Sequence, residues 1–332
     1  MPKVSVCIPN YNYGAFIEDA IKSVLNQTFK DFELIIVDDC STDNSVEIIK
    51  SFTDQRIKFI KNEKNIGRIK NINKVLSLAA GEFITLLPSD TFLTPNSIEE
   101  RVKILEKDKE IGLVFSAVNI IDQNKKIIEV YRYSVRNLIQ TGREAFETLI
   151  MGNYIITSSV MVRKTCYERL GFFDEEIAPR ARDWEMWLRI ALNNYKIAFI
   201  AKPLVFERIH DKNITNYFEK ENLIGMGDCE IIKGIFYKLP KTKYYKELEN
   251  KAIKSLSKRM IAKSAFNLIK GDAKLARKNL LFALTINNNL FFSPIFLSLF
   301  LLTLTGKLAK IFAFLPKSFL RKLKRIVFHT PS

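Results

Sequence analysis

The chain has 332 residues and a mass of 38.4 kDa, enough for one large domain with an appendage or for two domains. Hydrophobic residues make up 47% of it and charged residues 27%, which excludes a disordered, collagen-like or many-span membrane protein. Lys and Arg number 52 against 36 Asp and Glu, and the net charge of +16 predicts a polyanionic partner or an anionic membrane surface.

The four cysteines are widely scattered and form no Cys-x-x-Cys pair. This distribution predicts neither a zinc site nor a disulfide framework, and it favours a reducing cytosol. The first apolar run, residues 4–8, stops at Pro9 and is too short for the core of a signal peptide. We therefore expect a cytoplasmic protein.

Short apolar runs alternate with segments of helical period from Val4 to Ala117, a pattern typical of an α/β domain with a parallel sheet. We expect Gly81 to be the residue that follows the third helix. The predicted strands are residues 4–8, 32–37, 57–60, 83–87 and 113–117, and the predicted helices are residues 15–25, 45–52, 69–80 and 96–107.

The middle of the chain is less regular. A hairpin turn is predicted at residues 122–124, a strand at 159–163, an amphipathic helix at 183–193, and a strand at 197–200 that ends before Pro203. Helical periodicity alone continues over residues 217–286. These changes predict an α/β domain at 1–215, a helical extension at 216–288 and a tail at 289–332.

The tail combines apolar and basic residues. Its apolar stretch, 290–304, would form a helix of about 22 Å, which is shorter than the roughly 30 Å of a bilayer core. Beyond Asp272 the sequence holds no acidic residue, and Lys and Arg alternate with apolar residues from Lys307 to Arg325. This pattern favours peripheral attachment to an anionic membrane, with a buried helix or a protein interface as alternatives.

Polar clusters follow three of the predicted strands, at the edge where ligands bind in an open parallel sheet. They are residues 9–12, 38–41 and 89–90. Tyr11 could stack on a base, and Asp39 could accept hydrogen bonds from an imino group or a ribose hydroxyl. Asp90 is a hard oxygen donor suited to Mg²⁺ or Mn²⁺ that bridges two phosphates. Helix capping or turn formation is the structural alternative for Asp38 and Asp43.

Several short motifs stand in a fixed order in the first 97 residues. They are VSVCIPNYN at 4–12, SVLNQT at 23–28, FELIIVDDCSTD at 32–43, NIG at 65–67 with Asn73, and GEF at 81–83 with PSD at 88–90. This series resembles the family 2 glycosyltransferases, inverting enzymes with the GT-A nucleotide-diphospho-sugar fold, and DWEMWLR at 183–189 resembles their later catalytic motif. The resemblance implies a Rossmann-like, mostly parallel sheet flanked by helices and followed by a C-terminal helical region.

The resemblance also implies residue roles. Pro9, Tyr11 and Asp39 would contact the nucleoside, Asp90 would bind a divalent cation (Mn²⁺ or Mg²⁺), and Asp183 would be the general base. The sequence departs from the family pattern at three positions: Pro88 and Thr91 stand where further Asp residues are frequent, and Arg182 replaces the commoner acid before Asp183. For Asp183, helix capping is the structural alternative.

Four further residues are candidates for the same site. Arg208 and His210 resemble a family element in which basic groups lie over the diphosphate or shape the acceptor side. Arg68 is a candidate phosphate contact, with a solvated helix face as the alternative. Trp184 is a candidate for stacking on an acceptor sugar.

Together these features predict an inverting transfer of a sugar from a nucleoside diphosphate sugar, a UDP-sugar by family resemblance, to a saccharide or lipid-linked acceptor of the cell envelope. The general base deprotonates the acceptor hydroxyl while the cation offsets charge on the leaving diphosphate. A sugar nucleotidyltransferase, a non-catalytic basic protein that binds membranes or nucleic acid, and an inactive transferase are the alternatives. The basic residues concentrate in the tail rather than on the sheet, which argues against a nucleic acid partner.

Overall fold

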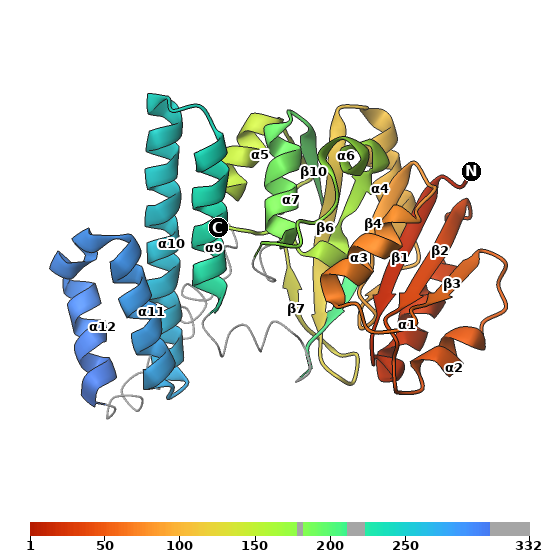
Figure 1. The fold of residues 1–332 in the computed structure, drawn as a ribbon, viewed down its shortest axis with the longest axis horizontal. Coiled ribbons are helices and arrows are strands. Elements are labelled where there is room, and N and C mark those ends of the chain that lie inside the picture. Colours follow the sequence, from red (N-terminus) through yellow and green to blue (C-terminus); the bar gives the residue numbers. More distant parts are fainter. Residues whose placement is uncertain (178–181, 211–222, 306–332) are drawn as a thin grey trace. The chain divides into compact units, whose positions relative to one another are not determined.

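The computed structural model describes residues 1–177, 182–210 and 223–305. The chain divides into two compact units (Figure 1). Unit 1 comprises residues 1–146, 155–175 and 183–211, and unit 2 comprises residues 147–154, 176–182 and 212–332. The strands belong to unit 1, and the long helices of the C-terminal part belong to unit 2.

Unit 1 is built on a ten-stranded sheet in the order β3-β2-β1-β4-β9-β6-β10-β5, with β7 added to β6 and β8 to β10. The pairs within β3-β2-β1-β4 and the pair β6-β10 are parallel, and β9 joins these two blocks by antiparallel pairing to β4 and β6. The strands are β1 (Val4–Asn10), β2 (Phe32–Asp38), β3 (Ile57–Lys61), β4 (Phe83–Leu86), β5 (Phe92–Leu93), β6 (Ile111–Ile121), β7 (Ile127–Tyr131), β8 (Leu138–Gln140), β9 (Met161–Arg163) and β10 (Lys196–Arg208). The predicted α/β class is confirmed.

Helices accompany the sheet. Those predicted from periodicity are α1 (Gly14–Leu25), α2 (Ser45–Lys50), α3 (Arg68–Ser77), α4 (Ser97–Lys107) and α7 (Arg182–Leu192). Two short helices, α5 (Gly142–Leu149) and α6 (Lys164–Leu170), and a 3₁₀ turn, η1 (Thr157–Ser159), were not predicted. Elements this short show less than three turns of apolar periodicity, so the sequence signal for them is weak.

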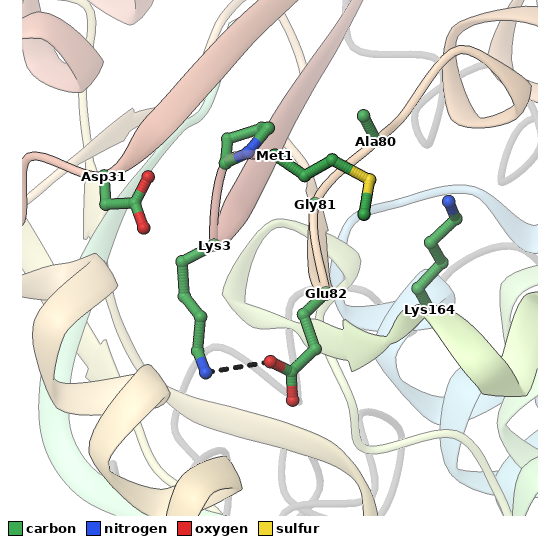
Figure 2. Close-up of a pocket in the computed structure, with 8 residues that line it drawn as sticks. Met1, Lys3, Asp31, Ala80, Gly81, Glu82 and Lys164 are labelled. Carbon is green, nitrogen blue, oxygen red and sulfur yellow. Dashed lines mark ion pairs between the residues drawn. The ribbon is translucent and has the colours of Figure 1, made fainter.

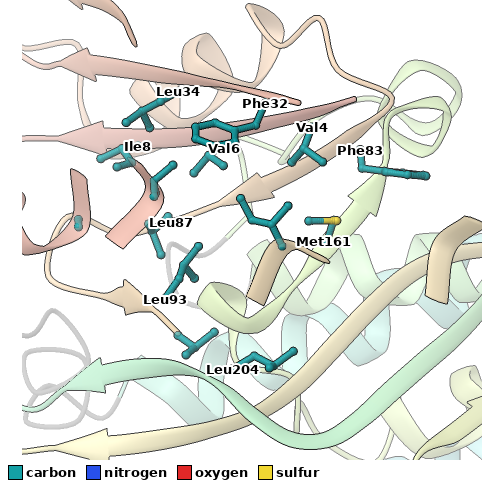
Figure 3. Close-up of a cluster of buried hydrophobic side chains, with 14 of the residues drawn as sticks. Val4, Val6, Ile8, Phe32, Leu34, Phe83, Leu87, Leu93, Met161 and Leu204 are labelled. Atoms are coloured by element: carbon teal, nitrogen blue, oxygen red, sulfur yellow. The ribbon is translucent and has the colours of Figure 1, made fainter. Parts of the chain in front are cut away.

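Strand alternation places different helices on the two faces of the sheet. Val4, Val6 and Ile8 of β1 belong to one buried cluster with residues of α1 and α4 (Figure 3). Cys7 points to the other face, where its thiol lies 3.6 Å from the Val75 carbonyl oxygen of α3. The core is therefore formed on both sides of the parallel block, as the nearly continuous apolar run of β2 predicts.

Two predictions about element ends are wrong. The strand expected to stop before Pro203 continues to Arg208 as β10, because shifts in register between Ile200 and Val205 accommodate the residue that cannot donate a hydrogen bond. Helix α3 ends at Ser77, so Gly81 is not its C′ residue. Gly81 instead packs on β1, where an added Cβ would lie 2.6 Å from the Ser5 nitrogen.

Unit 2 contains helices that pack side by side (Figure 1). They are α9 (Leu223–Lys238), α10 (Lys243–Ile269), α11 (Ala273–Ile286), the 3₁₀ turn η2 (Asn288–Phe292) and α12 (Pro294–Thr305). The Thr242 and Asp272 side chains cap α10 and α11 by accepting from backbone N–H groups. None of the described helices combines the length and the apolar character needed to cross a membrane. The basic segment predicted from Lys307 onward lies outside the described residues.

Candidate active site

Asp39 follows β2 and organises the loop that leads into α3. Its carboxylate accepts hydrogen bonds from the Asn62 side chain at 2.8 Å, the Ile66 nitrogen at 2.9 Å and the Gly67 nitrogen at 3.0 Å. Gly67 has φ +88°, a conformation that glycine adopts without strain. Asp39 is 1% exposed. This residue therefore shapes the loop beside the predicted nucleoside position, in addition to being a candidate contact.

Asp38 and Asp43 form turns, which is the structural alternative to a role in ligand binding. The Asp38 carboxylate accepts hydrogen bonds from the Ser41 nitrogen and hydroxyl and from the Asn10 amide. Asp43 accepts from the Gly14 nitrogen at 2.8 Å and the Ser45 nitrogen at 3.0 Å. These bonds hold the turns after β1 and β2 against each other.

Tyr11 and Pro9 lie at the carboxyl end of β1. The Tyr11 side chain is exposed, as a stacking platform for a base requires. The Pro9 carbonyl oxygen accepts a hydrogen bond from the Ser89 hydroxyl at 3.0 Å, which ties the end of β1 to the segment that carries Asp90.

Asp90 is paired with His210. Its Oδ2 lies 3.0 Å from His210 Nε2, and both side chains are largely buried. The His210 ring stacks on Phe16 at a centroid distance of 4.7 Å and lies edge-on to Tyr13 at 6.0 Å. Burial raises the pKa of the Tyr13 phenol, the Asp90 carboxylate raises it further, and Arg68 lowers it. The His210, Tyr13 and Phe16 rings thus lie near one another beside Asp90.

Asp183 stands in the first turn of α7. Its Oδ2 accepts a hydrogen bond from the Thr157 hydroxyl at 2.7 Å, and its Oδ1 accepts from the Trp184 nitrogen at 2.7 Å. The Asp183 carboxylate is therefore held by a backbone N–H group of the first turn of α7 and by a neighbouring side chain. The sequence motif predicted the helix, but not the contact with Thr157.

Glu207 is a site residue that the sequence reasoning missed. Its Oε2 accepts hydrogen bonds from the Ser158 hydroxyl at 2.6 Å and the Thr91 hydroxyl at 3.3 Å. Burial, together with the nearby Asp90 carboxylate, raises its pKa to about 7. The available signal is an acid next to Arg208 in the sequence, but the predicted strand stops before Pro203, so Glu207 falls outside every predicted element.

Two predicted site residues are buried in contacts with other parts of unit 1. Arg208 is 4% exposed and forms an ion pair with Asp19 of α1 at 2.8 Å, with its guanidinium over the Phe16 and Phe92 rings. Trp184 is 1% exposed and lies in the core. Diphosphate contact by Arg208 and acceptor stacking by Trp184 stay predictions, and each would require the side chain to leave these surroundings.

The three predicted acids lie along one region of unit 1. β1 pairs with both β2, which leads to Asp39, and β4, which leads to Asp90. Thr91 and Ser158 both donate hydrogen bonds to Glu207, and the residue before Ser158, Thr157, donates to Asp183. The carboxylates are thus linked through the carboxyl ends of the parallel strands and the turn η1.

The cavity in Figure 2 lies at the opposite edge of the sheet. It measures about 350 Å³ and is lined by Met1, Pro2, Lys3, Asp31, Ala80, Gly81, Glu82 and Lys164. These residues precede or begin β1, β2, β4 and α6, and Lys3 forms an ion pair with Glu82 at 2.8 Å. None of the predicted site residues lines it, so the predicted chemistry belongs to the other edge.

The residues around Asp90 fit a divalent cation that is held chiefly by the diphosphate of a bound nucleotide. In the part of the chain that the structure describes, no three His, Cys, Asp or Glu side chains form a metal-binding group. Asp90 offers one carboxylate and His210 an imidazole close beside it. A cation shared with a diphosphate needs only one or two protein carboxylates, so Asp90 could be its protein ligand.

A mixed sheet with acids at the carboxyl ends of its parallel strands has polar groups at the edge where open α/β sheets bind ligands. The sequence model described as Glycosyl transferase family 2 matches residues 5–171, which is half of the chain. The chain belongs to this family and is a glycosyltransferase. The family membership leaves the nucleotidyltransferase and non-catalytic alternatives without support.

Relatives carry the same designation. An uncharacterized glycosyltransferase of Methanocaldococcus jannaschii is 33% identical over 223 residues, which are 66% of this chain and 74% of the relative. A Bacillus subtilis protein named as a glycosyltransferase of teichuronic acid biosynthesis is 31% identical over 153 residues, or 46% of this chain and 60% of the relative.

Solved structures share the fold. The structure of S. aureus TarS 1-349 with UDP-GlcNAc has a TM-score of 0.60 and 16% identity, and the match covers 99% of this chain and 89% of that one. A mannosyltransferase from Pyrobaculum calidifontis with GDP-Man and Mn²⁺ has a TM-score of 0.58 and 16% identity, with 94% and 86% covered. At this identity the match shows that the GT-A fold is common to the three proteins.

Proposed function

We propose that this protein is an inverting glycosyltransferase that moves a sugar from a UDP-sugar to a saccharide or lipid-linked acceptor in cell-envelope polysaccharide synthesis. The observation that carries the proposal is the linkage of Asp39, Asp90 and Asp183 along one edge of the sheet. Carboxylates at that edge could serve donor recognition, cation binding at the leaving group and acceptor activation.

The donor would lie over the ends of β1, β2 and β4. The exposed Tyr11 ring would stack on the base, and the loop held by Asp39 would border the nucleoside. Asp90, with His210 beside it, would hold a divalent cation that offsets charge on the departing diphosphate. Arg68, exposed at the start of α3, would approach the phosphates.

Asp183 would accept the proton of the acceptor hydroxyl as that oxygen attacks the sugar. A carboxylate in hydrogen-bond reach of the attacking hydroxyl typically contributes about 10²- to 10⁴-fold in rate. A single displacement of this kind inverts the configuration at the anomeric carbon. It needs no covalent nucleophile in the protein.

Attachment to the cytoplasmic face of a membrane would bring the enzyme to a lipid-linked acceptor. In unit 2, Phe292, Ile295 and Leu301 leave 82%, 67% and 61% of their surfaces exposed. The sequence after Thr305 carries Lys and Arg among apolar residues and no acid. Apolar burial and attraction to anionic lipids act together in such segments. The Bacillus subtilis relative named for teichuronic acid biosynthesis supports an envelope polysaccharide as the product.

A donor screen tests the proposal. The melting temperature would be measured with UDP-glucose, UDP-galactose, UDP-N-acetylglucosamine and GDP-mannose, each with Mn²⁺ and with EDTA. We expect one UDP-sugar at 1 mM to raise the melting temperature by several degrees with Mn²⁺ and by less with EDTA, because bound ligand stabilises only the folded state. No stabilisation by any nucleotide sugar would contradict the proposal.

A further inference from the structure

Two adjacent hydroxyl groups on one turn bind two carboxyl groups from distant parts of unit 1. Thr157 donates to Asp183 Oδ2 at 2.7 Å, and Ser158 donates to Glu207 Oε2 at 2.6 Å. Asp183 lies in the first turn of α7, whereas Glu207 lies near the end of β10. The turn η1 therefore connects the predicted general base to a strand of the central sheet.

The turn itself is firmly held. The Ser159 hydroxyl and nitrogen both donate to the Ile156 carbonyl oxygen, at 2.7 and 3.0 Å. The Val160 carbonyl oxygen, just after the turn, accepts from Thr85 at 2.5 Å and from Arg101 at 3.2 Å. Ser158 is 1% exposed. A turn with its backbone and neighbours bound in this way keeps the Thr157 hydroxyl in one place.

Glu207 also reaches the donor side. Its carboxyl accepts from the hydroxyl of Thr91, the residue after Asp90. An Asp at position 91, which is frequent in the family pattern, would place a second carboxylate against Glu207 and repel it. Thr91 and Glu207 therefore form a compatible pair, in which the hydroxyl satisfies the acid from β10.

We propose that Thr157, Ser158 and Glu207 are positioning residues that hold the Asp183 carboxylate at a set place relative to Asp90. The inference rests on the proposed function, because it assigns a role to the neighbours of the proposed base. Thr157 acts directly on Asp183, and Glu207 acts through Ser158 and the turn. Precise placement of a base matters because small displacements from the reacting atoms lower the rate steeply.

The test compares Thr157→Val, which removes the hydroxyl at nearly constant volume, with Thr157→Ser, which keeps it. Release of UDP from the UDP-sugar that stabilises the protein most in the donor screen, with water as acceptor, is the readout. We expect Thr157→Val to lower kcat about ten-fold and to leave the Kd for UDP within two-fold. Thr157→Ser should keep kcat within about three-fold of the wild type.

Thr28→Val is the matched control. Thr28 also donates to a carboxylate, Glu99 Oε2 at 2.8 Å, but it lies before β2 at the amino edge of the sheet. This variant should keep wild-type kcat. Ser158→Ala should lower kcat, and combining it with Thr157→Val should add little, because Ser158 acts on Asp183 only through the turn that carries the Thr157 hydroxyl.

The outcomes separate the two proposals. Wild-type kcat in Thr157→Val, beside an inactive Asp183→Asn, would overturn the positioning role and leave the proposed function intact. Absence of UDP release by the wild type would overturn both. If Thr157→Val melts more than about 5 °C below the wild type, the comparison of Thr157→Ser with Ser158→Ala decides, and equal kcat values for these two would contradict the role.

Discussion

At the scale of single residues, the surroundings of Glu207 predict a pH dependence of stability. Its pKa is about 7 in the folded protein against 4.5 ordinarily, because the carboxyl is buried near Asp90. The folded state therefore keeps a proton that the unfolded chain has lost between about pH 4.5 and 7. Stability from this group is complete below pH 4.5, falls as the pH rises to about 7, and is level above that.

Glu207→Gln should remove this fall. The free energy of unfolding would be measured with urea at pH 5 and at pH 8, with EDTA present. From pH 5 to pH 8, we expect the free energy of unfolding of the variant to rise by about 1–3 kcal/mol relative to that of the wild type. Other titrating groups are shared by the two proteins, so the difference reports on Glu207. If the free energy of unfolding changed equally in both proteins from pH 5 to pH 8, Glu207 would not be buried as described.

Gly81 predicts a loss of stability from a single methyl group. An added Cβ would lie 2.6 Å from the Ser5 nitrogen and 2.7 Å from the Val4 carbonyl carbon. Because backbone cannot move aside cheaply, Gly81→Ala should cost about 1–3 kcal/mol or more in urea unfolding. Gly234→Ala, on the exposed side of α9 with nothing near its Cβ position, should instead gain about 0.5–1 kcal/mol. Equal effects of both changes would contradict this packing.

At the scale of elements, Arg101 joins α4 to β4 and to the segment after η1. Its guanidinium is fully buried and donates to the Ser97 carbonyl and hydroxyl, the Thr85 hydroxyl and the Val160 carbonyl. Arg101→Ala would leave these acceptors unsatisfied in a cavity, and we expect it to cost about 3–5 kcal/mol in urea unfolding.

Arg101→Lys should restore little of that loss, because an ammonium group cannot make the forked contacts of a guanidinium. Lys103→Ala, on the same helix but exposed, is the control and should leave the unfolding curve unchanged. A small effect of Arg101→Ala, equal to that of the control, would show that α4 is not held through this side chain.

The elements also show what could be predicted. The alternation of apolar runs and helical periods located β1 to β4 and α1 to α4, because a buried parallel sheet requires near-continuous apolar strands. Short elements such as β5, β8 and η1 depend on long-range pairing that no local pattern encodes. The link from Asp183 to Glu207 through η1 was therefore beyond the sequence, although Asp183 itself stood in a recognisable motif.

At the scale of the whole molecule, the net charge of +16 and the exposed apolar residues of unit 2 predict membrane binding. The protein should sediment with vesicles that contain phosphatidylserine and much less with phosphatidylcholine vesicles. Raising the salt from 0.1 to 0.5 M should weaken binding, because screening reduces attraction to anionic lipids. Affinity for RNA or DNA equal to that for the anionic vesicles would favour a nucleic acid partner instead.

A triple variant locates the surface. Replacing Phe292, Ile295 and Leu301 by Ser should reduce binding at least ten-fold, since each loses apolar area that would enter the interface. The matched control replaces Ile127, Ile128 and Ile139, which are exposed on β7 and β8, by Ser and should bind as the wild type does. Equal loss in both variants would exclude unit 2 as the attachment surface.

Asp183→Asn tests the central claim most directly, because Asn keeps the size of the side chain and removes its capacity to accept a proton. Release of UDP and transfer to an acceptor would be measured with the donor found by thermal screening, together with the Kd for UDP. The account predicts a loss of at least 10²-fold in kcat and a Kd for UDP within two-fold of the wild type. Unchanged turnover would remove Asp183 from the role of general base.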